Sequence, residues 1–255
     1  MRQMLFAFAL LFAALTAYAQ PDYIGKFDAY TGFTYASSPG LNLDQRGFHT
    51  QGGLNRNRWL SMGIDYSIFM GESSLAPSNL TTKEQNQLGA FAASQNIPPS
   101  VVASLLLPYD ITTQTFAGGP QLAYRHFKRV AFLFHPGLGL IHESVKAKPG
   151  SALQTGVVDY LESVGQLSSS NRKSDTTYFW GVGGGVEWTA SRNVHLRFTT
   201  DYVHTPIFDG FLKNPVNVVR FSVGPTFNFG KNVAQPKNVA QSKDAAQPKS
   251  IAQSK

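Results

Sequence analysis

Hydrophobic and polar residues alternate with a period of two along most of the chain between residues 23 and 229. In the segment 59–70, Leu60, Met62 and Ile64 alternate with small or polar residues. Side chains with this spacing lie on opposite faces of a β-strand. The pattern predicts eight strands, each long enough to cross a bilayer at a tilt. They span about residues 23–35, 47–55, 59–70, 112–126, 130–142, 177–189, 194–204 and 216–229.

The segments between these strands alternate in length. Short turns near residues 56, 128 and 191 follow the second, fourth and sixth strands, whereas the other connections are long and span about residues 36–46, 71–111, 143–176 and 205–215. Short turns at one end and long loops at the other are typical of outer-membrane barrels. Nothing in the fold of a soluble β-sandwich would place every long loop at the same end. We therefore predict an all-β fold, an eight-stranded antiparallel up-and-down transmembrane barrel.

Two of the long loops contain further signals. Thr81 and Glu84 form a capping-box pattern before an apolar-periodic stretch, and Pro98 and Pro99 precede a second candidate helix over about residues 99–107. These signals predict short helices in an external loop. The loop 143–176 contains an apolar run from Val157 to Val164 that fits either a helix or an extra hairpin, so ten strands remain an alternative.

The inward-facing positions carry equal numbers of positive and negative side chains. Eight strands enclose an interior only just wide enough for side chains, and charges confined there must be paired. The sequence therefore predicts a neutral, interlocked network, with a proton or ion pathway as the alternative. Its predicted members are Lys26, Asp28, Asp65, Arg125, Glu187, Arg197, Asp201 and Arg220.

Both ends of the chain differ from the alternating body. Residues 1–19 combine Arg2, an apolar run and a small-x-small pattern, which predicts an export signal cleaved between Ala19 and Gln20. Residues 231–255 contain a hexapeptide repeat with Lys at the end of each copy, and this low-complexity composition predicts a disordered tail. We expect the barrel to occupy residues 20–230.

Charge and composition exclude several classes of function. The net charge is +7, but the tail contains five lysines and one aspartate and so contributes +4. The body is nearly neutral and shows no basic stripe that would follow a phosphate backbone, so we expect no nucleic-acid partner. The chain has no Cys, which excludes zinc–thiolate sites and Cys nucleophiles.

Candidate catalytic groups occur near the outer strand ends. His142, Glu143 and Ser144 close one strand, and Asp201, His204 and Asp209 accompany another. These residue types at a polar rim are usually solvated loop residues, and the six His have no paired metal-ligand spacing. We expect no enzyme activity, no cofactor and no metal site.

Several strand motifs resemble those of the small outer-membrane β-barrel family of OmpA/OmpX type, over about residues 23–230. They are YTGFTY (30–35), NRWL (57–60), GGPQ (118–121), GGGVEW (183–188) and FSVGPTFNF (221–229). The resemblance implies an eight-stranded barrel inserted by the outer-membrane assembly machinery, with roles that are structural, adhesive or, rarely, enzymatic. In one respect the chain departs from the family: Phe229 is followed by the Lys-rich tail, so peptidoglycan anchoring by a folded domain is not implied.

The sequence favours a structural or surface-interaction role in a Gram-negative-type outer membrane, such as adhesion or envelope integrity, with the long loops as the interaction surface. A narrow pore for ions or small solutes is the alternative, followed by a lipid-modifying or hydrolytic enzyme at the rim. The expected partners are outer-membrane lipid, lipopolysaccharide and the insertion machinery. Peptidoglycan or anionic lipid is a further candidate partner, bound through the tail, and we expect a monomer.

Overall fold

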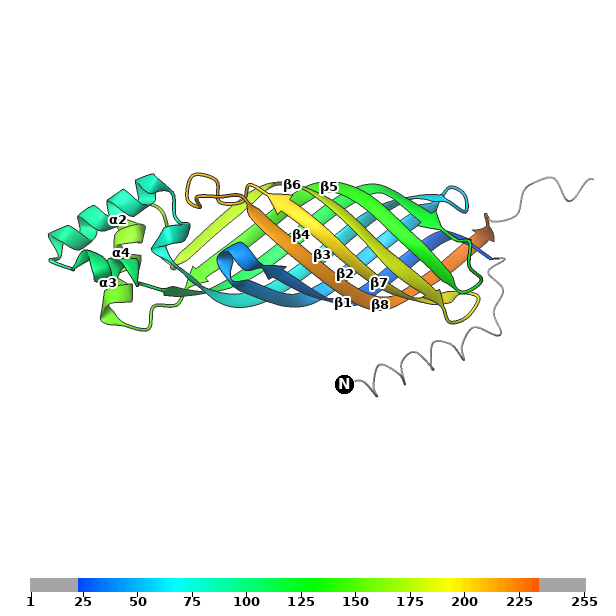
Figure 1. The fold of residues 1–255 in the computed structure, drawn as a ribbon, viewed down its shortest axis with the longest axis horizontal. Helices are drawn as coiled ribbons and strands as arrows, with labels where there is room; N and C mark the ends of the chain where they lie inside the picture. Colours follow the sequence, from blue (N-terminus) through cyan, green and yellow to red (C-terminus); the bar gives the residue numbers. More distant parts are fainter. Residues whose placement is uncertain (1–22, 234–255) are drawn as a thin grey trace, which may run out of the picture.

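The computed structural model describes residues 23–233, so the predicted signal segment and almost all of the Lys-rich tail lie outside the described residues. Eight antiparallel strands form one closed barrel in which each strand pairs with its sequence neighbours and the first pairs with the last (Figure 1). The strands are β1 (Gly25–Ser38), β2 (Leu43–Asn55), β3 (Leu60–Leu75), β4 (Leu107–Tyr124), β5 (Val130–Ala147), β6 (Arg172–Thr189), β7 (Val194–Thr205) and β8 (Val216–Asn232). The predicted fold class is confirmed.

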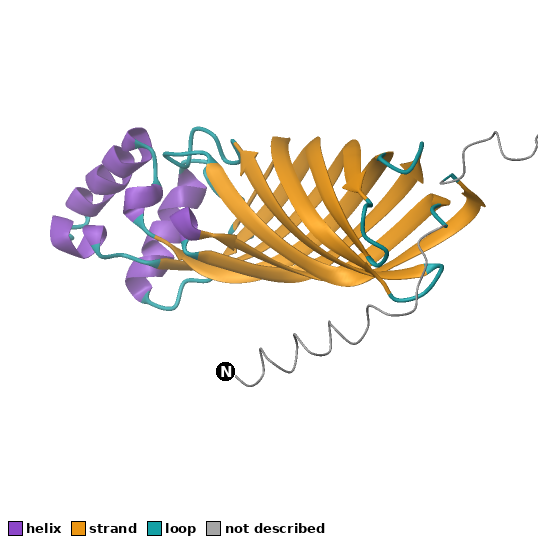
Figure 2. Ribbon diagram, turned by 45° about the vertical axis from the view of Figure 1, so that its right-hand side comes forward, coloured by secondary structure: helices purple, strands orange, loops and turns teal. Residues whose placement is uncertain are grey.

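The connections at one end of the barrel are short, and those at the other end contain all the helices of the described chain (Figures 1 and 2). In the turn between β2 and β3, the Asn57 side-chain oxygen accepts hydrogen bonds from the backbone N–H groups of Trp59 and Leu60. The helical end contains α2 (Thr82–Ser94), α3 (Pro99–Ala103), α4 (Ala152–Ser163) and the 3-10 turns η2 (Pro39–Leu41) and η3 (Pro77–Asn79).

The helix predictions are confirmed in part. Thr81 caps α2 by accepting a hydrogen bond from the Glu84 backbone N–H at 3.4 Å. The second helix was expected to reach residue 107, but α3 ends at Ala103 and β4 begins at Leu107. The loop 143–176 contains the single helix α4 between extensions of β5 and β6, so the ten-strand alternative is wrong.

The two faces of the strands differ in polarity in the way the alternation predicts. Inward positions are mostly polar and buried, whereas outward positions carry large apolar side chains that remain exposed. Examples of these exposed residues are Phe33, Phe48, Ile64, Met70, Phe116, Leu138, Leu140, Phe198 and Phe221. An apolar outer belt on a closed antiparallel barrel is the architecture of outer-membrane proteins, and it places the chain in an outer membrane.

Aromatic contacts lie near both ends of the outer surface. Beside the short turns, Trp59 and Phe127 lie against Tyr124, each with ring centroids 6.3 Å apart. Towards the helical end, Trp180 contacts Tyr202 at 5.9 Å. Such pairs of aromatic clusters are expected where a barrel meets the two bilayer interfaces.

In the part of the chain that the structure describes, no helix has the length and apolarity needed to cross a membrane.

The orientation of the barrel can be tested directly because the chain has no native Cys. We expect that Ala93→Cys, exposed on α2, reacts with a bulky maleimide on intact cells, since long connections face outward in such barrels. Lys128→Cys, exposed in a short turn, serves as the matched control and should react only after the outer membrane is opened. Labelling of Lys128→Cys alone on intact cells would mean the opposite orientation.

Candidate functional site

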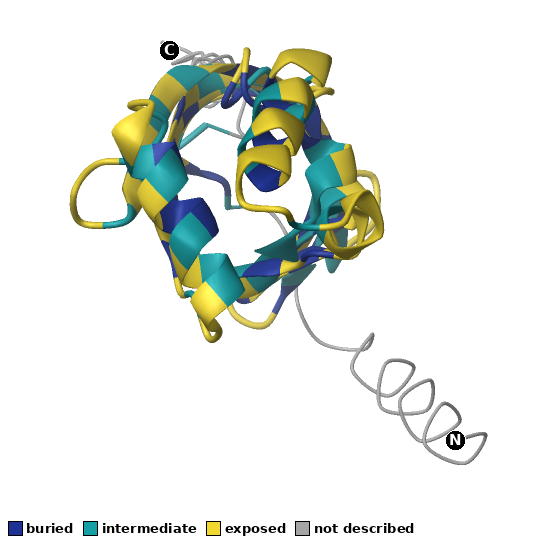
Figure 3. Ribbon diagram, turned by 90° about the vertical axis from the view of Figure 1, so that its left-hand side faces the viewer, coloured by how far each residue is buried: buried dark blue, intermediate teal, exposed yellow. Residues whose placement is uncertain are grey.

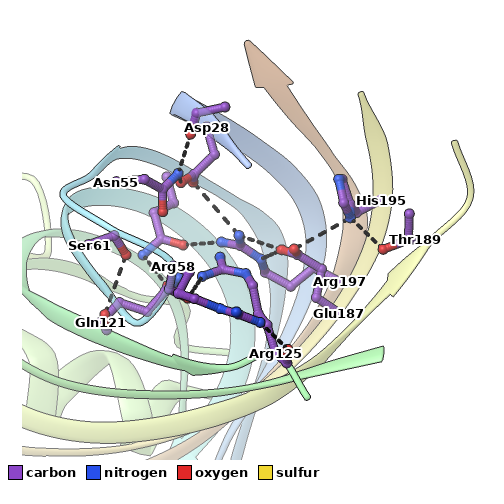
Figure 4. A network of polar contacts seen from close by, with 12 residues as sticks. Asp28, Asn55, Arg58, Ser61, Gln121, Arg125, Glu187, Thr189, His195 and Arg197 are labelled. Carbon is purple, nitrogen blue, oxygen red and sulfur yellow. Dashed lines mark hydrogen bonds and ion pairs between the residues drawn. The ribbon is translucent and has the colours of Figure 1, made fainter. Parts of the chain in front are cut away.

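Arg197 on β7 forms the centre of a buried polar network inside the barrel (Figure 4). Its side chain is 1% exposed, and its Nε and Nη2 atoms donate to Glu187 Oε2 at 2.9 and 2.6 Å. Glu187 lies directly opposite Arg197 in the β6–β7 register. Arg197 Nη1 donates to Gln51 Oε1 at 2.6 Å, and Asp28 Oδ1 lies 3.7 Å from Nη2. One guanidinium therefore joins strands β1, β2, β6 and β7.

Further polar side chains complete this network. Asn55 donates a hydrogen bond to Asp28 Oδ2 at 2.9 Å, and His195 Nδ1 lies 3.5 Å from Glu187 Oε1. Arg125 Nη1 donates to the backbone carbonyl of Arg58 at 2.7 Å, next to a short turn. Polar side chains therefore lie in the interior between the short turns and Arg197.

A second cluster is built around Asp201 on β7. His135 Nε2 lies 2.6 Å from Asp201 Oδ1, and Arg220 Nη2 lies 3.4 Å from Asp201 Oδ2. The strand register aligns His135, Gly183, Asp201 and Arg220 in one row across β5, β6, β7 and β8. Three charged or titratable groups thus meet in one layer of the interior.

Gly183 is the reason that His135 and Asp201 can meet. These two residues lie on either side of Gly183 in the row, and their side chains contact each other across the space above it. A Cβ atom at position 183 would collide with both the Asp201 carboxylate and the His135 ring. Gly53 plays the same role for Asp28, because a Cβ there would strike the Asp28 carboxylate.

Ion pairs within 4.0 Å join five of the eight predicted network residues, namely Asp28, Glu187, Arg197, Asp201 and Arg220. Asp65 and Arg125 are inward and partly buried, and within residues 23–233 neither has an ion-pair partner at that distance. Lys26 requires a correction, because it is exposed and its ammonium lies 5.5 Å from the Phe27 ring centroid. A register shift between Gly25 and Phe27 breaks the alternation there.

The two clusters also contain four neutral or titratable side chains that are not among the predicted network residues: Gln51, Asn55, His135 and His195. All four lie on the inward side of their strands. The alternation alone would have identified them, but the candidate network was limited to side chains with a fixed charge at neutral pH. A buried ion also needs neutral hydrogen-bond partners for its remaining atoms, and these residues provide them.

The candidate catalytic groups do not come together. His142 is exposed and pairs with Thr176, whereas Glu143 is buried, because neighbouring residues of a strand point to opposite faces. In the second group, Asp201 is buried among the network residues and His204 hydrogen-bonds to Asn217. For residues 23–233, no group of three or more potential metal ligands is present.

The external loops fold together as a cap over the outer mouth of the barrel (Figure 3). Phe91 of α2 stacks on Tyr160 of α4 with ring centroids 4.5 Å apart. The Thr81 backbone N–H donates to the Phe211 carbonyl at 3.0 Å, which connects the α2 loop to the loop between β7 and β8. Buried side chains from these loops share one apolar core with the outer ends of the strands; they include Leu80, Leu88, Leu105, Val157, Val158, Leu161, Ile207, Phe208 and Phe211.

No protein-family model and no curated protein matches the chain. Solved structures with a similar fold include Ail, the attachment invasion locus protein of Yersinia pestis, at 14% identity and a TM-score of 0.43, covering 82% of this chain and 99% of that one. Neisserial surface protein A has 16% identity and a TM-score of 0.46, and the match covers 80% of this chain and 96% of that one. The outer membrane protein OprG from Pseudomonas aeruginosa has 11% identity and a TM-score of 0.48, and the match covers 84% of this chain and 100% of that one. Because these scores are below 0.5, the fold assignment rests on the closed strand order of the chain itself.

Removal of the central guanidinium should destabilise the barrel strongly. In Arg197→Met, Glu187 loses its main partner and stays buried, which typically costs about 3–5 kcal/mol in the free energy of unfolding. Urea unfolding in lipid vesicles measures this loss. Arg56→Met, at an exposed turn position, is the control and should change stability by less than about 0.5 kcal/mol. Equal stabilities of the two variants would contradict a central role for Arg197.

Gly183→Ala should destabilise the barrel by about 1–3 kcal/mol, since the added methyl group overpacks the contact between His135 and Asp201. The direction of the stability change is informative, because replacing Gly by Ala inside a strand otherwise stabilises the protein. Gly52→Ala is the matched control, as its Cβ would have only an ordinary contact at 3.9 Å. The same unfolding measurement applies, and a stabilised Gly183→Ala would refute the steric argument.

Proposed function

We propose that this outer-membrane barrel serves as a surface-interaction protein whose helical cap meets the environment. The main support is that the external loops fold into one ordered cap over the outer mouth, with an apolar core that they share with the outer strand ends. Mobile loops would have little fixed surface to present, whereas helices packed in this way present a defined one. A defined surface of this kind is suited to a role in adhesion or envelope integrity.

The interior supports this proposal over the narrow pore. The two clusters join side chains from strands that are not neighbours: Arg197 on β7 donates to Gln51 on β2 at 2.6 Å, and His135 on β5 lies 2.6 Å from Asp201 on β7. A conducting lumen would require these buried polar contacts to separate, and separating a buried charged group from its partner costs several kcal/mol. We therefore expect a closed lumen.

The remaining partners belong to the same proposal. The exposed apolar belt would contact outer-membrane lipid and lipopolysaccharide, and the assembly machinery would insert the barrel. Arg56, Lys128 and Arg192 lie exposed at the short turns, on the side where anionic lipid or peptidoglycan would meet the Lys-rich tail. The barrel needs no second copy to complete its sheet, so we propose a monomer.

The test compares cells that display the wild-type protein with cells that display a variant in which a short Gly/Ser linker replaces residues 82–103. We expect weaker attachment of the variant cells to surfaces, with unchanged sensitivity to detergents and dyes. Heat-modifiable gel mobility verifies that the variant barrel is folded. A second variant, Asn86→Lys/Gln95→Lys, alters the exposed face of the cap without changing its core and should also reduce attachment.

Three outcomes would overturn parts of this proposal. Unchanged attachment in both variants would remove the surface-interaction role, and increased dye entry alone would indicate a purely structural one. Steady single-channel conductance of the wild-type protein in planar bilayers would favour the narrow pore.

A further inference from the structure

An apolar cavity of about 60 Å³ lies between the outer strand ends and the cap. Its walls include Leu107 and Ile111 of β4, Val145 of β5, Leu161 of α4 and Phe211 of the loop between β7 and β8. One water molecule needs roughly 10–15 Å³ of such space, so the cavity has room for a short alkyl chain. Apolar walls hold water poorly, and an empty cavity forfeits dispersion contacts. The cavity is therefore suited to an apolar occupant.

One wall of this cavity contains a buried carboxylate with no cationic partner. Glu143 of β5 is 4% exposed, and its Oε1 atom accepts one hydrogen bond, from the Thr113 hydroxyl at 3.2 Å. Among the described residues, no Lys, Arg or His nitrogen lies within 4.0 Å of its carboxylate. A buried carboxylate without a counter-charge either takes up a proton or gains a cationic partner, and the ammonium of a ligand would be such a partner.

Lys173 also lines the cavity, but its ammonium is already engaged. Its Nζ atom donates to the Gln166 carbonyl at 3.1 Å and to Gln166 Oε1 at 2.9 Å, and it lies 4.8 Å from the Phe211 ring centroid. Asp175, which lies opposite Glu143 on β6, accepts hydrogen bonds from the Thr176 and Phe208 backbone N–H groups. The Lys173 ammonium and the Asp175 carboxylate are thus each held by other groups, and among residues 23–233 Glu143 is left without a cationic partner within 4.0 Å.

We infer that this cavity binds a small amphiphilic amine, with its alkyl chain between the apolar walls and its ammonium against Glu143. A metal ion fits the site poorly, because Ca²⁺ and Mg²⁺ need several oxygen ligands and this lining is almost entirely apolar. A carboxylic acid fits poorly as well, since it would place a second carboxylate beside Glu143. The inference is independent of whether the cap mediates adhesion.

The test uses the full-length protein in lipid nanodiscs and three probes of equal length: n-butylamine, n-butanol and butyrate. The methyl chemical shifts of Ile111 and Val145, which line the cavity, report binding at this site rather than partition into lipid. We expect n-butylamine to bind about tenfold or more tightly than n-butanol, which corresponds to about 1.4 kcal/mol. Butyrate should bind most weakly.

Four variants, one of them a control, separate the effect of the charge from that of the cavity. Glu143→Gln should lose the preference for the amine but still bind n-butanol, and Glu143→Asp should keep the preference. Ala147→Leu adds bulk at the cavity wall and should weaken all three probes. Asp159→Asn, exposed on α4, removes the same charge elsewhere and should change nothing. Absence of butylamine binding by the wild type, or an equal preference in Glu143→Gln, would overturn the inference.

Discussion

The rest of the structure depends on the closure of backbone hydrogen bonding in a medium without water. Hydrocarbon offers no partner to a free N–H or C=O group, so a sheet can cross it only when its first and last strands pair, as β1 and β8 do. Closure makes one strand face point outward and the other inward. The same alternation that supplies an apolar belt therefore forces polar side chains into a narrow interior, and those side chains must satisfy one another.

The interior meets this requirement through cross-strand geometry. Glu187 and Arg197 are direct neighbours in the register of β6 and β7, and Asp201 and Arg220 are direct neighbours in β7 and β8. Long side chains need space as well as partners, and glycines provide it, since Gly183 leaves room for the contact between His135 and Asp201. The interior residues thus satisfy charge pairing and close packing at the same time. A substitution that changes the side-chain volume there also disturbs the charged contacts.

The sequence predicted the barrel, the strand order and the inward position of most charges, because a period of two and the loop lengths are local signals. The Glu187–Arg197 pair is also set locally, because the pairing of Thr189 with His195 beside the short turn places Glu187 opposite Arg197. Contacts across the barrel, such as Arg197 with Gln51, depend on closure and stagger, which no local pattern contains. Lys26 was misplaced because the register shift beside Gly25 breaks the alternation.

The outer ends of the strands were missed for a different reason. At Leu107, Ile111 and Val145, inward positions become apolar, and the rule of a polar interior therefore ends the predicted strands too early. Leu107 belongs to the core of the cap and Val145 packs against it, and Ile111 lines the adjoining cavity together with Leu161 and Phe211. The inward face of the strands therefore changes along the barrel, from polar in the interior to apolar where the strands meet the cap. Because the cap lacks a complete core without these strand ends, its order depends on the barrel beneath it.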